Sequence, residues 1–278
     1  MHEVLVGGVT LQNPILNAAG TMGFGSSYAD YIDLNRLGGL VTRTMTAAPR
    51  PGASNPRLWE TAAGLLNHVG LQNPGCEKFA QIFYRSLEKL HVPVVASITG
   101  TPDEIRQMTG RLCELERVKA IEVNLYCTYE QYRTMGYAAY LESCCRQVEA
   151  AAQAGDRPVW VKLLPLAGDI VETARAAAAA GAKCAVCANT YWAMALDETG
   201  HSRLGSQVGG LSGPAIKPLS VFQTWRLAQE TELDIVGCGG VMTADDVKEY
   251  LVAGAKAVCV GTANFNEPSS VEHILNAL

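Results

Sequence analysis

The chain has 278 residues, of which 48% are hydrophobic and 18% are charged. This apolar fraction excludes an intrinsically disordered or collagen-like chain and is sufficient to bury a large core. The 22 basic and 27 acidic residues give a net charge of −5, so the chain lacks the basic field that nucleic-acid binding requires.

The amino terminus and the cysteine count predict a cytoplasmic protein. Residues 1–3 open the sequence without the positive region and apolar run of a signal peptide. The most apolar stretch, residues 174–196, is interrupted by Arg175 and Lys183, so it falls short of the ~20 apolar residues of a membrane span. Nine cysteines, an odd number in a chain without a signal peptide, favour free thiols in a reducing compartment. We therefore expect a soluble intracellular protein that does not contact membranes.

Short apolar runs alternate with helical patterns along almost the whole chain. Most of the runs do not alternate with polar residues, which is typical of strands buried on both faces. They predict strands at residues 15–19, 40–42, 92–98, 120–124, 159–163, 184–188, 233–237 and 257–260. The helical patterns lie at residues 28–37, 76–90, 102–115, 137–154, 169–180, 215–230, 244–253 and 269–278. Eight βα units favour a TIM (β/α)8 barrel. An open doubly wound sheet is the alternative, because counts of elements cannot close a barrel.

The first residues precede this repeating pattern. Residues 3–12 predict a short β-hairpin that turns at Gly7 and Gly8 and could plug the bottom of the barrel. The turn-rich segment 49–56 is interpreted as a loop, since no linker or change of composition marks a boundary. We expect residues 1–278 to form one domain.

The active site of such a barrel lies at the carboxyl ends of its strands. Two of these ends are rich in glycine, at residues 237–240 and 260–262. Backbone N–H groups there could hold a phosphate, as late strand ends do in many barrels. The plainer interpretation is that these glycines only permit tight turns.

Other catalytic and metal patterns are absent from the sequence. It has no G-x-G-x-x-G after the first strand and no G-x-x-x-x-G-K-[ST]. The five histidines are scattered without H-E-x-x-H or serine-triad spacing, which argues against a zinc hydrolase or serine hydrolase. Cys184 and Cys187 could form half of a metal site, but buried strand cysteines are the better interpretation, and we expect no metal.

Several sequence blocks together resemble the class 1 dihydroorotate dehydrogenases, particularly their 1B catalytic subunits. The resemblance covers almost the entire chain. Its blocks are Asn13-Pro-Ile-Leu, Gly23-Phe-Gly, Asp33-Leu-Asn-Arg-Leu-Gly, Gly70-Leu-Gln-Asn-Pro-Gly, Val118-Lys-Ala-Ile-Glu-Val-Asn, Val161-Lys-Leu, Gly209-Gly-Leu-Ser-Gly-Pro-Ala-Ile-Lys-Pro and Val260-Gly-Thr-Ala-Asn-Phe.

The resemblance implies an FMN-containing barrel that oxidises dihydroorotate to orotate in pyrimidine biosynthesis. The implied FMN contacts are Ala19, Arg43, Thr44, Ser97, Asn124, Lys162, Ala188, Gly213, Gly239, Gly240, Gly261 and Thr262. The implied substrate contacts are Arg43, Asn67, His68, Gly70, Leu71, Asn124, Asn189 and Thr190.

Two residues carry the implied chemistry. Lys162 matches a lysine beside the flavin ring, where a cation stabilises negative charge; a salt bridge at the barrel mouth is the alternative. Cys127 matches the catalytic base, which removes a proton from the carbon beside the substrate carbonyl while hydride leaves the neighbouring carbon. The three asparagines 67, 124 and 189 suit a cyclic imide, because an amide both donates and accepts hydrogen bonds. Taken singly, each of them could also cap a loop.

The chain departs from the family pattern around the implied substrate. The family's Asn-x-Ser-Cys-Pro-Asn is Asn124-Leu-Tyr-Cys-Thr-Tyr here, so Tyr126, Thr128 and Tyr129 replace its serine, proline and second asparagine. Arg43 replaces a lysine, His68 an alanine, Ser97 an asparagine and Ala19 a serine. Sites that hydrogen-bond one substrate discriminate strongly, so such a set of changes affects specificity.

Three functions therefore stay open. The first is an FMN oxidoreductase acting on dihydroorotate. The second is a paralogue that uses the same chemistry on another small cyclic or carboxylated substrate. The third is a flavin-binding or non-redox barrel protein without dehydrogenase activity. The resemblance also implies an electron-transfer subunit that carries FAD and an iron–sulfur cluster. This chain itself lacks a second nucleotide fingerprint and iron–sulfur cysteine spacing. We further expect a homo-oligomer.

Overall fold

A closed ring of parallel strands forms the centre of the computed structural model, which describes residues 2–278. Its strands are β3 (Ile15–Asn17), β4 (Leu40–Val41), β7 (Val94–Ile98), β8 (Val118–Asn124), β9 (Val159–Lys162), β10 (Ala182–Cys187), β13 (Asp234–Cys238) and β14 (Ala257–Val260). They pair in the order β3-β14-β13-β10-β9-β8-β7-β4. All of these pairs are parallel, as predicted for strands buried on both faces.

The two edges of this sheet meet, which makes it a barrel rather than an open sheet. Leu16 forms a parallel bridge with Gly39. The buried Asn17 side chain bonds both backbone groups of Val41, accepting from its N–H at 2.9 Å and donating to its carbonyl at 2.8 Å. An amide side chain thus substitutes for strand pairing where β3 and β4 are short. The TIM-barrel prediction is confirmed.

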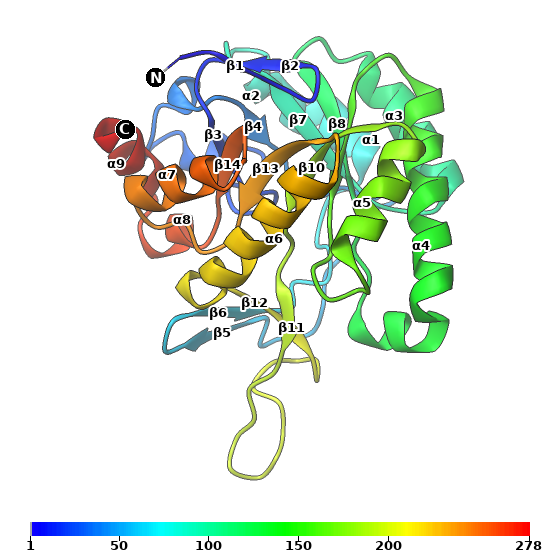
Figure 1. Ribbon diagram of the computed structural model, residues 1–278, viewed down its shortest axis with the longest axis vertical. Helices are drawn as coiled ribbons and strands as arrows, with labels where there is room; N and C mark the ends of the chain where they lie inside the picture. The colour runs from blue at the N-terminus through cyan, green and yellow to red at the C-terminus, as the bar shows by residue number, and fades with distance from the viewer. Residues whose placement is uncertain (1) are drawn as a thin grey trace.

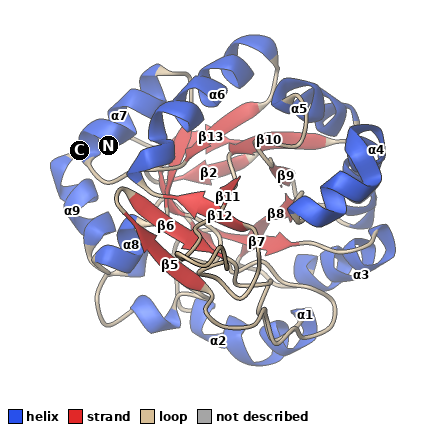
Figure 2. Cartoon of the chain, turned by 90° about the horizontal axis from the view of Figure 1, so that it is seen from below, coloured by secondary structure: helices blue, strands red, loops and turns tan. Residues whose placement is uncertain are grey.

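Helices surround the barrel (Figure 2). They are α1 (Cys76–Lys78), the π-helical η3 (Phe79–Phe83), α2 (Tyr84–Leu87), α3 (Pro102–Cys113), α4 (Tyr129–Ala154), α5 (Ile170–Ala179), α6 (Lys217–Glu230), α7 (Ala244–Val252), α8 (Ala263–Asn266) and α9 (Ser270–Ala277), with the 3-10 turn η4 (Pro214–Ile216) before α6. Their apolar faces and the outer face of the strands form the larger hydrophobic core. The smaller core fills the barrel interior.

Two predicted helices differ from the structure. The helix predicted at residues 28–37 is wrong: only the 3-10 turns η1 (Ser26–Tyr28) and η2 (Leu34–Arg36) form there. The Asp33 carboxylate accepts from the backbone N–H of Asn35, so it begins a new turn in the middle of the predicted helix. The helix predicted at 137–154 begins earlier, at Tyr129, because Thr128 and Gln131 form a capping box, and the chain bends at Gly136.

The amino-terminal hairpin is confirmed and closes one end of the barrel (Figure 1). Strands β1 (Val4–Val6) and β2 (Val9–Leu11) are antiparallel and turn at Gly7 and Gly8. The fully buried Trp160 donates its indole N–H to the Gly7 carbonyl at 3.1 Å. The Gly7 N–H donates to the Asp234 carboxylate at 2.7 Å.

A second, antiparallel sheet lies at the opposite end of the barrel and has no counterpart among the predicted strands (Figure 1). It consists of β5 (Leu58–Thr61), β6 (Gly64–Asn67), β11 (Tyr191–Ala193) and β12 (Gly209–Ser212), in the order β11-β12-β6-β5. Figure 2 shows this sheet lying across the mouth of the barrel. It therefore covers the ends of the barrel strands where the sequence predicts a site.

Between residues 2 and 278, no helix combines the length and apolar character needed to cross a bilayer. All nine cysteines are free thiols.

Candidate functional site

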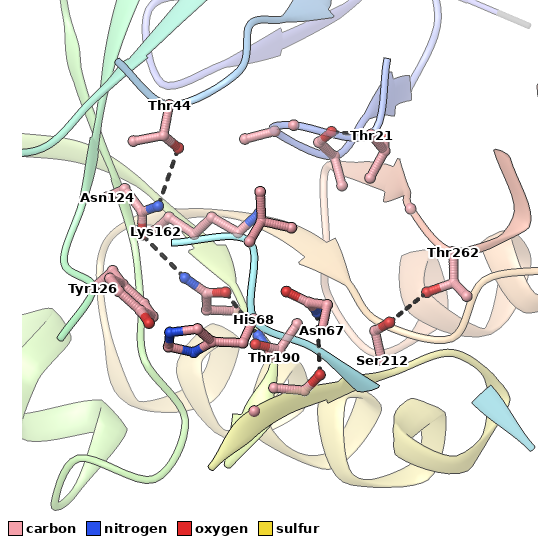
Figure 3. Close-up of a pocket in the computed structure, with 18 of the residues that line it drawn as sticks. Thr21, Thr44, Asn67, His68, Asn124, Tyr126, Lys162, Thr190, Ser212 and Thr262 are labelled. Carbon is pink, nitrogen blue, oxygen red and sulfur yellow. Dashed lines mark hydrogen bonds between the residues drawn. The ribbon is translucent and has the colours of Figure 1, made fainter. Parts of the chain in front are cut away.

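A cavity opens between the carboxyl ends of the barrel strands and the small antiparallel sheet (Figure 3). Most residues implied as FMN or substrate contacts line it: Ala19, Arg43, Thr44, Asn67, His68, Gly70, Leu71, Asn124, Lys162, Ala188, Asn189, Thr190, Gly239, Gly240, Gly261 and Thr262. Ser97, Cys127 and Gly213 do not line it. The parallel strands bring residues from the whole length of the chain to one edge, where the barrel fold predicted the site.

Backbone N–H groups at one end of the cavity form a site that we call the glycine cradle. It consists of Gly239 and Gly240 after β13, and Gly261 and Thr262 after β14. Among the hydrogen bonds formed within residues 2–278, none uses the N–H of these four residues. Gly240 has a φ of +69°, and an added Cβ would lie 2.8 Å from the carbonyl oxygen of Gly213. Unpaired N–H groups that converge on a cavity favour an anion such as a phosphate.

The cradle therefore fits a phosphate group. Thr262 donates its hydroxyl to Ser212 at 2.9 Å, which ties the cradle to the small sheet (Figure 3). Gly213, which follows Ser212, is outside the cavity lining, but its carbonyl oxygen lies close beside Gly240.

Lys162 is the last residue of β9, and its side chain extends into the cavity beside Asn124 (Figure 3). The residue is only 6% exposed. Burial lowers the pKa of its ammonium group, but the nearby Cys238 and Glu122 outweigh burial, so its pKa lies above the ordinary value. Lys162 is thus a buried cation that stays protonated.

Cys238 is a cavity-lining residue that sequence reasoning left among the core cysteines. It pairs in register with Cys259 on the neighbouring strand. A hydrogen bond from Cys259 and the charge of Lys162 lower the pKa of the Cys238 thiol to about 7, against the effect of burial. Its position at the end of a predicted strand was the only available signal.

Two asparagines face the cavity from the ends of β8 and β10, on either side of β9. Asn189 donates its side-chain N–H to the Asn124 side-chain oxygen at 3.0 Å, and Asn124 donates to the Thr44 hydroxyl at 3.1 Å. The Thr44 and Ser97 hydroxyls lie 2.9 Å apart. Ser97 is therefore fully buried behind the cavity wall, one step from the residues that line it.

The small sheet supplies the opposite wall. Asn67, the last residue of β6, donates its side-chain N–H to the Gly210 carbonyl on β12 at 3.1 Å (Figure 3). Arg43 donates to the Gln72 carbonyl at 3.0 Å, and burial lowers the pKa of its guanidinium. The third amide thus lies on the small sheet, whereas Arg43 follows β4 of the barrel and bonds the Gln72 carbonyl from there.

Bulky side chains line the outer part of the cavity. Tyr126, Tyr129 and Trp192, which we call the aromatic wall, all line it, and His68 does so too. Tyr129 and Trp192 pack edge to face with ring centroids 5.6 Å apart. Burial raises the pKa of the Tyr126 phenol to about 12, so it is a hydrogen-bond donor rather than a base at neutral pH. Trp192 lies two residues after Thr190, a signal that sequence reasoning did not use.

Cys127 lies behind this wall, outside the cavity lining. It is 6% exposed and belongs to the same hydrophobic cluster as Tyr140 and Cys144 of α4. Tyr140 donates its hydroxyl to the Leu125 carbonyl at 2.9 Å, which holds the segment before Cys127 against the helix. Burial raises the pKa of the Cys127 thiol to about 11.

Cys184 and Cys187 are buried strand residues. In the part of the chain that the structure describes, no three histidine, cysteine, aspartate or glutamate side chains are grouped so as to hold a metal ion.

Comparison with known proteins gives consistent matches over the whole chain. A family model described as dihydroorotate dehydrogenase matches residues 1–278. The dihydroorotate dehydrogenase B (NAD(+)) catalytic subunit of Desulforudis audaxviator is 43% identical over 269 residues, which cover 96% of this chain and 88% of that protein. The subunits of the same name from Listeria monocytogenes EGD-e and Solidesulfovibrio magneticus are each 40% identical, over 99% of this chain and 91% of theirs.

Proposed function

Because the chain belongs to the dihydroorotate dehydrogenase family, we propose that it is an FMN-dependent oxidoreductase that converts dihydroorotate to orotate. One observation carries this proposal. A single cavity brings together the glycine cradle, the buried cation Lys162 and the three amides of Asn67, Asn124 and Asn189. An anion site, a cation and an imide-binding set are what this reaction requires of a protein.

In this proposal each part of the cavity has one task. FMN, when bound, supplies the two-electron acceptor. The glycine cradle binds its phosphate, and Lys162 stabilises negative charge on its ring. The amides hold the pyrimidine ring of the substrate, and Arg43 binds its carboxylate. Cys127 takes the proton from the carbon beside the carbonyl. Because Cys127 lies outside the cavity lining, in the same hydrophobic cluster as Tyr140, the segment 125–128 must turn toward the cavity for this step.

We also propose that the electrons leave through a second polypeptide. The relatives are named as catalytic subunits of NAD-dependent enzymes, which supports a partner that carries the electron path to NAD. An FAD and iron–sulfur subunit would fill this role, and the assembly would be an oligomer in the cytoplasm. Size measurement of the chain alone and with a candidate partner tests this part.

Anaerobic titration of the purified protein with dihydroorotate tests the main proposal. Bleaching of the flavin absorbance with one equivalent of substrate supports it, and release by heat followed by chromatography identifies the nucleotide. FAD in place of FMN would contradict the cofactor, while FMN that dihydroorotate does not reduce would contradict the substrate.

A second candidate function is the same chemistry on another small cyclic or carboxylated substrate. The observation that favours it is the cavity lining itself, where His68, Tyr126 and Tyr129 stand in place of the family's smaller residues. Under this alternative, dihydroorotate reduces the wild-type flavin slowly or not at all. The double change Arg43→Lys with Tyr129→Asn then improves the rate by about one to four orders of magnitude, since each unpaired buried polar group costs ~1–3 kcal/mol. Fast reduction of the wild type would exclude this alternative.

A further inference from the structure

The hydrogen bonds of the cavity amides continue into the barrel interior and end on a buried carboxylate. From Asn189 they run through Asn124, Thr44 and Ser97, and Ser97 donates its hydroxyl to the Glu122 carboxylate at 2.7 Å. Glu122 lies on β8 and is 1% exposed. We call these five side chains the buried polar chain; Figure 3 shows its outer half, from Thr44 through Asn124 to the amide beyond it.

The Glu122 carboxylate fixes the donor-to-acceptor direction of the hydrogen bonds in the buried polar chain. A carboxylate only accepts hydrogen bonds, so the single hydroxyl proton of Ser97 is used on Glu122. Ser97 can then only accept from Thr44, and Thr44 can only accept from Asn124. If the Asn124 amide were turned over, its oxygen would face a hydroxyl oxygen with no proton to offer. Asn124 therefore keeps its NH2 toward Thr44 and its oxygen toward Asn189.

The far end of the buried polar chain has the same direction. The Asn189 side-chain oxygen accepts from the Thr190 backbone N–H at 2.8 Å, so its NH2 must point to Asn124. After these bonds, Asn189 and Asn124 each retain one N–H and one oxygen lone pair. Each amide thus offers the cavity one donor and one acceptor in a fixed arrangement.

This arrangement complements a cyclic imide. In the imide edge O=C–NH–C=O a carbonyl acceptor lies beside an N–H donor, whereas in a 4-amino pyrimidine the amino group donates and the adjacent ring nitrogen, which carries no hydrogen, accepts. An amide whose N–H and oxygen are fixed to match the imide therefore meets the amino-substituted edge donor to donor and acceptor to acceptor in a buried site, which is where hydrogen-bonding sites discriminate most.

We propose that Glu122 is a positioning residue that, through Ser97 and Thr44, fixes the orientation of the Asn124 and Asn189 amides and so selects an imide edge over an amino-substituted one. The inference rests on the proposed function insofar as the ligand is a pyrimidine carboxylate. Ser97, which links Thr44 to Glu122 here, stands where the family pattern has an asparagine.

Calorimetric binding of orotate and of its 4-amino analogue to the flavin-loaded protein tests the proposal. The matched variants are Thr44→Val, which keeps the shape and removes the hydroxyl, and Thr44→Ser, which keeps the hydroxyl. We expect wild type and T44S to bind orotate at least about tenfold more tightly than the analogue, the effect of one mismatched buried hydrogen bond. In T44V the ratio of the two dissociation constants should fall to within about threefold, because the Asn124 amide is free to turn over.

Glu122→Gln changes the inner end of the buried polar chain, at a residue that does not contact the ligand. Glutamine can donate as well as accept, so the ratio should also fall in E122Q; this variant carries the test if T44V does not fold. An unchanged ratio in E122Q, or a T44V variant that weakens both ligands equally, would overturn the proposal and leave a packing role. If folded wild type binds neither ligand, the proposed function fails. Neutron diffraction then decides the inference: a Thr44 hydroxyl hydrogen directed at Ser97 supports it, and one directed elsewhere overturns it.

Discussion

Replacing Cys127 by alanine is the most informative single change, because the structure buries the proposed base. Its pKa rises from 9.0 to about 11 through burial alone. At 1.36 kcal/mol per pKa unit, this is about 2.7 kcal/mol against the thiolate, and at pH 7 about one molecule in 10⁴ carries it. If the thiol acts from this environment, flavin reduction should accelerate about tenfold per pH unit between pH 7 and 10.

The assay is anaerobic stopped-flow reduction of the bound flavin by dihydroorotate across this pH range. Cys127→Ala should keep its flavin, since the residue does not line the cavity, and should react about 10²–10⁴-fold more slowly without the pH slope. Cys144→Ala is the matched control, because Cys144 is also a buried thiol of the same cluster. Its rate should equal that of wild type.

Two results would refute this reasoning in different ways. A C127A variant that reduces its flavin at the wild-type rate would show that the base lies elsewhere. A wild-type profile with an apparent pKa below about 8 would show that the reacting thiol has left its apolar surroundings, so the burial seen next to Tyr140 does not apply during the reaction.

Three further changes test the cradle, the cation and the hairpin. Lys162→Met should keep FMN bound but lower its midpoint potential by about 30 mV or more, the two-electron equivalent of ~1.4 kcal/mol, measured by spectroelectrochemistry; an unchanged potential would remove Lys162 from the ring. Gly240→Ala places a Cβ against the Gly213 carbonyl at a residue with positive φ. It should raise the flavin dissociation constant, measured by fluorescence titration, at least about tenfold. Gly110→Ala, at an open helical position, should leave that constant unchanged. Trp160→Phe loses the bond to the hairpin and should destabilise the fold by about 1–3 kcal/mol in denaturant unfolding, with flavin binding retained.

The barrel could be predicted from sequence because its strands are buried on both faces. Runs such as residues 159–163 are apolar without alternation, and this signal depends only on local sequence. The small sheet carries no such signal. Its strands have only three or four residues, and β12 contains two glycines. They pair with strands that are distant in sequence, as Asn67 does with Gly210. The helix predicted at 28–37 was wrong for a related reason: one side-chain bond at Asp33 outweighed a weak helical pattern.

The two ends of the cavity also differ in how far sequence can predict them. The glycine cradle is made of backbone N–H groups, so its position follows from strand ends and turn residues. At the other end the direction of each side chain matters. Cys127 and Tyr126 are neighbours in sequence, yet Tyr126 lines the cavity while the Cys127 thiol packs toward α4. The capping box of Thr128 and Gln131 begins α4 directly after Cys127, and its sequence pattern is a signal that the prediction of this helix did not use.

The departures from the family pattern therefore do not all bear on the same property. Tyr126, Tyr129 and His68 change the shape of the outer cavity, where apolar contact distinguishes ligands by size. Ser97 instead lies in the barrel wall and keeps Asn124 connected to Glu122, so the inner amides retain a fixed set of donors and acceptors. A chain changed in this way can accept a different substituent at the cavity mouth and still require an imide at its floor. Ligand panels should accordingly vary the substituent and the ring edge separately.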